Sequence, residues 1–232
     1  MTTAIILSAG QGSRLLPLTA DRPKCLIEVG GKAIIDHQLD ALTAAGVDRL
    51  IVVGGYRLDK LASHLDARRG DVELRINPFW EVSSSIGSVW AARDALDGDF
   101  VILNGDTVYT PELLREGLSR LRAGVNLFVE RVKAPQIDDM LVSVVNDRVR
   151  AVSKMLDPQR ASHRSLGVVA AKGDGLRYRD MLDAVIAKRG GIQSFHHLII
   201  HEISAHAPVY PVVLGGKWVE IDRPEDIAGW KG

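Results

Sequence analysis

Residues 4–14 read Ala4-Ile5-Ile6-Leu7-Ser8-Ala9-Gly10-Gln11-Gly12-Ser13-Arg14, an apolar run that passes directly into a glycine-containing loop. The run is nearly continuous, which predicts a strand buried on both faces. Glycines after such a strand let backbone N–H groups approach phosphate oxygens closely. The Gly10-x-Gly12 pair alone is equally typical of a tight strand-to-helix turn, so both interpretations stay open at this point.

The loop matches neither of two well-known phosphate-binding patterns. No Lys-Ser or Lys-Thr pair follows at P-loop spacing, and no third glycine completes a dinucleotide fingerprint. The chain continues as Leu16-Pro17-Leu18-Thr19 and Asp21-Arg22-Pro23-Lys24-Cys25-Leu26. One loop region therefore combines glycines with an arginine and a lysine, which favours an anionic ligand.

Strand and helix patterns alternate through the first half of the chain. Apolar runs at 50–53 and 100–103 resemble the one at 4–7, and helical periods are expected at 34–45, 58–65 and 86–96. This alternation predicts a mainly parallel sheet. Closely spaced strands are expected at 126–132, 141–145 and 149–154, around an Asn146-Asp147 turn, which predicts a small inserted β-hairpin region. Helices at 178–188, 194–203 and 224–230 and strands at 209–214 and 218–221 complete one expected domain, 1–232.

Composition excludes several classes of protein. Lys plus Arg and Asp plus Glu both number 29 in 232 residues, so no global positive field is available to hold nucleic acid. The 46% hydrophobic and 25% charged content is that of a globular protein. No apolar run approaches the roughly 18 residues of a spanning helix, and no basic signal region precedes Ser8, so we expect a cytoplasmic protein without a membrane partner. Cys25, the single cysteine, cannot form an intrachain disulfide, and we expect a small half-buried side chain there.

The compound motif resembles the opening of the NTP-dependent nucleotidyltransferases that make sugar nucleotides and CDP-alcohols. Leu-x-Ala-Gly-x-Gly-Ser-Arg, Pro-Leu-Thr and Pro-Lys-x-Leu carry the resemblance, although Ser8 stands where alanine is more frequent. Later segments agree with it, namely Asn104-Gly105-Asp106, Lys154 before Ser165-Leu166-Gly167, and Trp218-Val219-Glu220-Ile221-Asp222. Among subfamilies the chain looks most similar to short phosphocholine and aminophosphonate cytidylyltransferases. The resemblance implies a Rossmann-like (GT-A-like) α/β fold, a mixed, mainly parallel sheet flanked by helices.

The resemblance implies attack by a phosphate or phosphonate oxygen on the α-phosphorus of a nucleoside triphosphate, with release of pyrophosphate. The protein must hold two anions in line and neutralise their charge. Asp106 follows a buried strand, where a ligand for Mg²⁺ is expected because Mg²⁺ prefers carboxylate oxygens. By resemblance Asp222 is the second metal ligand. For both residues, capping of a turn or helix is the alternative.

Three cations have expected roles. Lys24 follows a proline that restricts the chain, and we expect it to make a catalytic phosphate contact. Arg14 suits a bidentate grip on the leaving pyrophosphate. Lys154 matches a family position that contacts the acceptor's phosphate. The alternative for each is a solvated charge or a surface ion pair.

The residues expected to bind the nucleotide are Leu7, Ser8, Ala9, Gly10, Gln11, Gly12, Ser13, Arg14, Gly54, Ser85, Ser88 and Asp106. Ser85 and Ser88 would contact the base or ribose, although serine-rich loops are often only turns. The acceptor is expected to meet Lys24, Tyr109, Lys154, Trp218 and Glu220. The rings of Tyr109 and Trp218 would hold a quaternary or primary ammonium by cation–π attraction.

We therefore expect a magnesium-dependent nucleotidyltransferase, with CTP favoured as donor and a small phosphorylated alcohol or aminophosphonate, such as phosphocholine, as acceptor. One alternative is a sugar-1-phosphate nucleotidylyltransferase that uses another NTP. Another is a catalytically silent nucleotide-sensing module, against which the joint presence of Arg14, Lys24, Asp106 and Asp222 argues. The nucleobase, the acceptor and the oligomeric state stay open.

Overall fold

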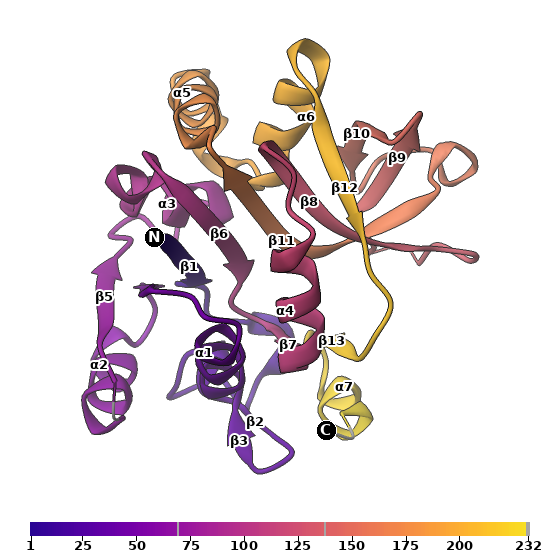
Figure 1. Cartoon of the computed structure of the whole chain (residues 1–232). Helices are drawn as coiled ribbons and strands as arrows, with labels where there is room; N and C mark the ends of the chain where they lie inside the picture. The colour runs from indigo at the N-terminus through magenta and orange to yellow at the C-terminus, as the bar shows by residue number, and fades with distance from the viewer. Residues whose placement is uncertain (69, 137, 231–232) are drawn as a thin grey trace.

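The computed structural model describes residues 1–68, 70–136 and 138–230, so Gly232, the expected end of the domain, lies outside the described residues. A nine-stranded sheet forms the centre of this described part (Figure 1). Its strands are β1 (Thr2–Ser8), β4 (Arg49–Gly54), β5 (Val72–Ile76), β6 (Asp99–Asn104), β8 (Gly124–Arg131), β9 (Leu141–Val145), β10 (Arg148–Ser153), β11 (His163–Lys172) and β12 (Val209–Val213).

Parallel pairing aligns the carboxyl ends of the first strands. β1 lies between β4 and β6, with Ser8 opposite Gly54 and Leu7 opposite Asn104. β11 then runs antiparallel to β6 and β8, and β12 lies parallel to β8. The β9–β10 hairpin pairs with the start of β11, at the edge of the molecule remote from β5 in Figure 1. Loops that leave β1, β4 and β6 therefore meet at one edge of the sheet.

Helices cover both faces of the sheet. They are α1 (Ile34–Ala44), α2 (Leu58–Ala67), α3 (Ser85–Ala91), α4 (Pro111–Ser119), α5 (Gly175–Ile186), α6 (His197–His206) and α7 (Pro224–Gly229). The alternation along β1 shows how the layers form, because Ile5 packs with α3, α5 and α6, whereas Ala4 and Ile6 pack with α1, α2 and α4. The apolar run that starts the chain is therefore buried on both faces.

Two small sheets lie beside this layered core. β2 (Glu28–Val29) pairs with β3 (Lys32–Ala33), and β7 (Thr107–Tyr109) pairs antiparallel with β13 (Trp218–Glu220). The backbone N–H of Ile221 donates to the Asp106 carbonyl (2.9 Å). A third apolar cluster, which includes Ile221, packs under these strands and α7. The C-terminal segment is thereby fixed next to the end of β6.

The predicted mixed α/β fold with flanking helices is confirmed, although some elements differ. The sequence patterns miss β5, a half-exposed edge strand, and β11, whose apolar run is broken by Gly167 in a left-handed conformation (φ 74°). They also miss α4. The helix expected from residue 194 starts at His197, and the backbone N–H of His196 donates to Ser85 Oγ (3.0 Å) instead of joining the helix.

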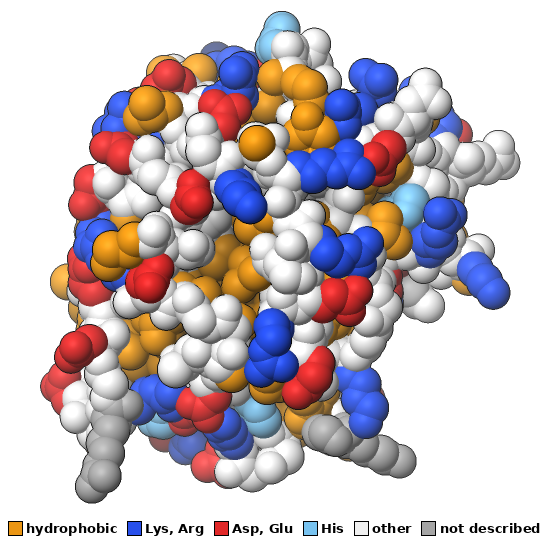
Figure 2. Space-filling model, viewed as in Figure 1, with side chains coloured by type: hydrophobic (Ala, Val, Ile, Leu, Met, Phe, Trp, Pro, Cys, Tyr) orange, Lys and Arg blue, Asp and Glu red, His pale blue; other side chains and the backbone are white. Residues whose placement is uncertain are grey.

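Surface properties agree with the balanced composition. Basic and acidic side chains are interspersed over the face drawn in Figure 2. None of the helices in the described ranges combines the length and the apolar character needed to cross a membrane.

Candidate active site

The loop after β1 adopts a conformation that needs glycine. Gly12 has a left-handed backbone (φ 73°), and a Cβ there would lie 2.9 Å from Cβ and Cδ of Lys24. The loop continues into a 3₁₀ turn at Ser13–Leu15, and a second such turn begins at Lys24. The glycine therefore lets the lysine stem pass directly over the loop and reach the end of the sheet.

Lys24 lies between two carboxylates. Its Nζ donates to Asp106 Oδ2 (2.9 Å) and to Asp222 Oδ1 (2.6 Å). Burial alone lowers the pKa of Lys24, but the two carboxylates outweigh burial and hold that pKa above its usual value. Burial likewise raises the pKa of Asp106, and the Lys24 ammonium reverses this effect and keeps the pKa below its usual value. Lys24, Asp106 and Asp222 therefore form one ion-paired cluster.

Glu220 joins the two aspartates. One carboxylate oxygen from each of Asp106, Glu220 and Asp222 lies within 4.8 Å of the others, so the three can hold a metal ion. Partial loss of hydration, and then the negative charges of Asp106 and Asp222, raise the pKa of Glu220 to about 8, although this residue remains exposed. Such hard oxygen donors fit Mg²⁺. The sequence placed Glu220 with the acceptor, whereas the structure brings its carboxylate to the same group as the two predicted metal ligands.

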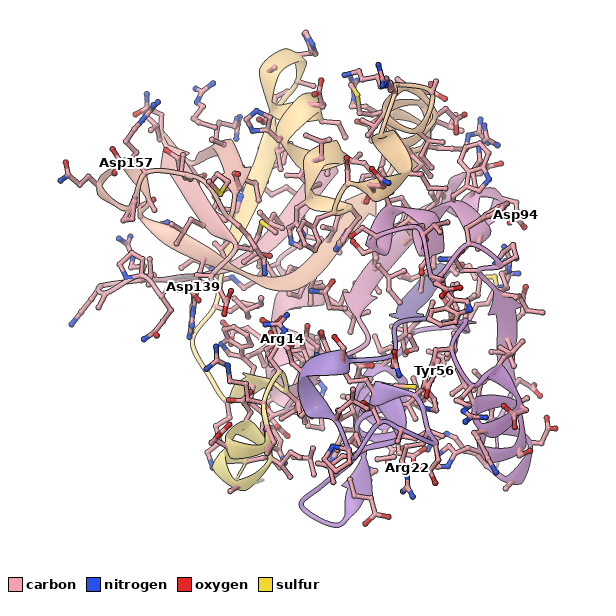
Figure 3. The ribbon with its side chains drawn as sticks, turned by 180° about the vertical axis from the view of Figure 1, so that it is seen from behind. Arg14, Arg22, Tyr56, Asp94, Asp139 and Asp157 are labelled. Atoms are coloured by element: carbon pink, nitrogen blue, oxygen red, sulfur yellow. The ribbon has the colours of Figure 1, made fainter. Side chains whose placement is uncertain are left out.

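Arg14 extends the charged cluster toward solvent. Its Nη1 lies 3.0 Å from Asp222 Oδ2 and 3.9 Å from an oxygen of Asp138, and about half of the side chain is exposed. Figure 3, seen from behind, shows Arg14 and Asp139 close to the middle of this face, with Asp94 and Asp157 near opposite margins. A guanidinium in this position can meet an anion that enters from solvent.

These charged groups line a cleft with two compartments. The larger compartment, about 330 Å³, extends from Leu7, Ala9 and Gly10 to the serine-rich loop before α3 and to the start of α6. The smaller one, about 240 Å³, is lined by Ser8, Gly12, Ser13, Lys24 and Asp222, among others. Arg14 and Asp106 line both compartments. The cleft thus opens at the edge of the sheet where the loops after β1 and β6 meet.

Two residues predicted to bind the nucleotide do not line the cleft. Gln11 does not contribute to either compartment. Gly54 is buried, and a Cβ there would meet the side chains of Leu58 and Leu61. Its carbonyl accepts from the backbone N–H of Asn77 (2.8 Å). Gly54 therefore connects β4 to the serine-rich loop and is buried behind the cleft lining.

Ser85 and Ser88 line the larger compartment together with Asn77. Nδ2 of buried Asn77 donates to Ser83 Oγ (3.1 Å) and Ser88 Oγ (3.2 Å). A Cβ on Gly87 would lie 2.4 Å from Ser83 Oγ. Close packing and these hydrogen bonds give the loop a defined polar wall.

Lys154 and Trp218 both line the larger compartment, where each already has a partner. Nζ of Lys154 lies 5.3 Å from the centre of the Phe195 ring. The Arg164 guanidinium carbon lies 4.8 Å from the centre of the Trp218 ring, and Trp218 Nε1 donates to Glu130 Oε2 (3.1 Å). A protein cation therefore already occupies one face of each ring.

The predicted contact between Tyr109 and the acceptor is wrong, because this ring is 1% exposed and packs in the core below α1 and α4. Its hydroxyl donates to the Leu166 carbonyl (2.6 Å). Asp106 lies in the turn that precedes β7, so strand alternation does not relate the direction of its carboxylate to that of the Tyr109 ring. An aromatic cage built from Tyr109 and Trp218 is absent from the described cleft.

Two buried histidines at the start of α6, His196 and His197, also line the cleft, and the sequence patterns assigned them no role. His196 Nε2 donates to Asn104 Oδ1 (3.1 Å), and His197 Nε2 lies 2.9 Å from Ser165 Oγ. His201, one turn beyond His197, is exposed. The sequence signal closest to these histidines was the Ser165-Leu166-Gly167 motif, because Ser165 contacts His197.

Buried neutral histidines predict lower stability in mild acid. Burial lowers the pKa of His196 to about 4, so between about pH 6.5 and 4 the unfolded chain binds more protons, and the free energy of unfolding decreases as the pH falls. Between pH 6.5 and 5 this residue alone contributes a loss of about 2 kcal/mol. The free energy of unfolding, measured by urea denaturation, should change less with pH in His196→Asn than in the wild type. The prediction would be contradicted if His196→Asn kept the pH dependence of the wild type. It would also be contradicted if His201→Asn, the control at an exposed site, reduced that pH dependence by the same amount.

Cys25 lies beside Lys24 but is 1% exposed, and burial raises the pKa of its thiol to about 12. At pH 8 only about one thiol in 10⁴ is then ionised. We expect slow reaction of the native protein with a disulfide reagent and nearly full turnover in Cys25→Ser. Rapid labelling of the folded protein, or a nucleotide trapped covalently on this sulfur, would contradict the expectation.

Comparisons with known proteins agree with this geometry. The family model described as MobA-like NTP transferase domain matches residues 4–137. The CTP:phosphoglutamine cytidylyltransferase of Campylobacter jejuni is 38% identical over 120 residues, 49% of this chain and 47% of the relative. The UTP–glucose-1-phosphate uridylyltransferase of Haloferax volcanii is 32% identical over 146 residues, 62% of this chain and 60% of the relative. These alignments span about half to three fifths of each relative's length.

Among solved structures, the CTP:phosphocholine cytidylyltransferase of Streptococcus pneumoniae has the same fold. The TM-score is 0.80 at 21% sequence identity, and the match covers 98% of this chain and 96% of that structure. The shared architecture therefore extends well beyond the segment that the family model matches.

Proposed function

The chain belongs to the family of MobA-like NTP transferase domains, and from this membership we propose a specific reaction. It transfers a nucleoside monophosphate, with CMP from CTP favoured, to a small phosphorylated alcohol or aminophosphonate and releases pyrophosphate. The acceptor's phosphate or phosphonate oxygen attacks the α-phosphorus, the new P–O bond replaces the bond to pyrophosphate, and no protein nucleophile takes part.

The observation that carries the proposal is the position of Lys24. Its ammonium is held by Asp106 (2.9 Å) and Asp222 (2.6 Å) at the edge of the glycine loop. An ammonium at this position lies where it can neutralise charge on the phosphoryl oxygens of a bound substrate. A module that only senses a nucleotide has no need for two carboxylates that hold one lysine at this place.

Roles for the surrounding residues follow from the same geometry. We propose that Asp106, Glu220 and Asp222 hold Mg²⁺, which when bound supplies positive charge to the triphosphate. Arg14, half exposed at the cleft mouth, grips the leaving pyrophosphate. Its ion pair with Asp222 aims the guanidinium into the cleft before the substrate arrives.

CTP is favoured as donor because a relative 38% identical over half of the chain bears the name of a cytidylyltransferase. Asn77, Ser85 and Ser88 offer amide and hydroxyl groups on the wall that would face the base and ribose. The acceptor's cationic end would meet carboxylates of the same compartment, which Asp138 and Asp139 line. Carboxylates replace the aromatic cage in this proposal, because Tyr109 is buried in the core.

A sugar-1-phosphate acceptor is the second candidate. It is supported by the 32% identical relative that is named a glucose-1-phosphate uridylyltransferase. A hydroxyl-rich acceptor would use the same compartment through Ser165 and the two histidines beside it. The two candidates differ in the charge of the acceptor's distal end, which makes them separable by assay.

The test measures pyrophosphate release with each of four NTPs against phosphocholine, aminoethylphosphonate and common sugar-1-phosphates, with Mg²⁺ present. The proposal expects the highest kcat/KM for CTP with a cationic acceptor. Turnover confined to sugar-1-phosphates would support the second candidate. No release in any combination, together with measurable NTP binding, would support a silent nucleotide-sensing module.

A further inference from the structure

A glutamine occupies a core position of α1. Gln38 is 0% exposed and follows the apolar period of the helix, between Ile35 on one side and Leu39 and Leu42 on the other. Burial of an amide is unfavourable unless the amide finds hydrogen-bond partners. An apolar residue is the ordinary choice at this position, so the partners of Gln38 indicate why a polar one is present.

Both donors of Gln38 are used on one turn. Nε2 donates to the carbonyl of Asn104 (2.6 Å) and to the carbonyl of Thr107 (2.8 Å). These two carbonyls stand on either side of Gly105 and Asp106. The amide oxygen Oε1 is buried and lacks a hydrogen-bond partner within the described part of the chain. The amide of Gln38 therefore donates two hydrogen bonds to carbonyls of the turn, while its own carbonyl oxygen accepts none within the described residues.

Other side chains reach this turn through its own side chains, since Lys24 Nζ donates to Asp106 Oδ2 (2.9 Å) and His196 Nε2 donates to Asn104 Oδ1 (3.1 Å). Two backbone hydrogen bonds also hold the turn. The N–H of Gly105 donates to the Leu7 carbonyl (3.1 Å), and the N–H of Ile221 donates to the Asp106 carbonyl (2.9 Å). A Cβ on Gly105 would lie 2.3 Å from the Leu7 carbonyl oxygen, so the backbone passes very close to the end of β1. A small rotation of the peptide of Gly105 or of Asp106 would move the Asp106 carboxylate relative to Asp222 and Glu220.

We propose that Gln38 is a positioning residue, which acts from the back of the site by bridging the carbonyls of Asn104 and Thr107 and so fixing the Asp106 carboxylate in the metal-binding group. The inference rests on the proposed function, because it assigns Asp106 to that group. Gln38 touches no substrate, and its effect passes through the backbone of the turn. Sites of this kind work only when their ligands are held to within about 0.5 Å.

The test replaces Gln38 by methionine, which keeps an unbranched side chain of similar length and removes both donors. Three quantities are measured: Mn²⁺ affinity without nucleotide, by electron paramagnetic resonance; kcat and KM; and Tm. We expect Mn²⁺ affinity to fall about tenfold and kcat about tenfold or more, with the acceptor KM within about twofold. The control Leu42→Ala leaves a cavity in the same helix interface and should lower Tm while Mn²⁺ affinity stays within about twofold.

Three results would overturn the inference. The first is that folded Gln38→Met binds Mn²⁺ as tightly as the wild type does. The others are an equal loss of Mn²⁺ affinity in Leu42→Ala and an absence of Mn²⁺ binding in the wild type. If Gln38→Met does not fold, Gln38→Glu, which keeps the shape and at most one donor, must show a loss in the same direction. Mn²⁺ binding is measured without substrates. A wild type that binds Mn²⁺ but transfers no nucleotide would therefore refute the proposed function and leave the inference about Gln38 decided by the variants.

Discussion

Replacement of Asp106 by asparagine is expected to lower turnover by about 10²- to 10³-fold while the protein stays folded. The carboxylate accepts from Lys24 and lies within the group that can hold a divalent ion, and a neutral amide can compensate neither cation. The backbone bonds of the turn do not involve this side chain, so circular dichroism and Tm should change little. Asp222→Asn should have an effect of the same size.

The matched control is Asp94→Asn. Asp94 also pairs with an arginine, Arg75, but lies near the margin of the molecule in Figure 3 and is largely exposed. Its loss should leave kcat near the wild-type value, which is measured as steady-state pyrophosphate release. Near-normal turnover in both Asp106→Asn and Asp222→Asn, with divalent metal still required, would contradict the proposed site.

The glycine loop and Lys24 could be anticipated from the sequence because their geometry is local. One short segment contains, in succession, a buried strand, a glycine with a left-handed backbone and a lysine that follows a proline. The alternation rule also places Trp218, Glu220 and Asp222 on one side of their strand, and all three line the cleft. Local periodicity therefore predicts which side chains share a face.

Contacts between distant segments could not be anticipated in this way. The pairing of β7 with β13 brings Asp222 next to Asp106, and only the resemblance to a family suggested it beforehand. Tyr109 was assigned by closeness in sequence to Asp106, but its ring packs in the core against residues of α1 and α4 that are distant in sequence. Gln38 shows the same limit, because its hydrogen-bond partners lie 66 and 69 residues away.

Lys24→Met is expected to have two opposite effects, a large loss of turnover and a gain in metal affinity without nucleotide. Methionine keeps the unbranched stem that packs over Gly12 and removes the charge. We expect kcat to fall by about 10²- to 10³-fold, because the charge on the phosphoryl oxygens loses a fixed partner. Mn²⁺ affinity of the free protein should rise by at least about tenfold.

The gain follows from the positions of the donors. Lys24 and Arg14 together engage both oxygens of Asp222, and Lys24 also engages Asp106, so an entering divalent ion competes with the ammonium for the same carboxylates. Two unit charges 4 Å apart at an effective dielectric constant of about 20 interact by about 4 kcal/mol, and a third of that is already tenfold in affinity. The control Lys32→Met removes an ammonium that is paired with Asp40 outside the cleft, and it should change neither quantity. If Lys24 only stabilised the fold, its replacement would lower Tm without raising Mn²⁺ affinity. Unchanged or weaker Mn²⁺ binding in Lys24→Met would therefore show that the ammonium and the metal do not share these carboxylates.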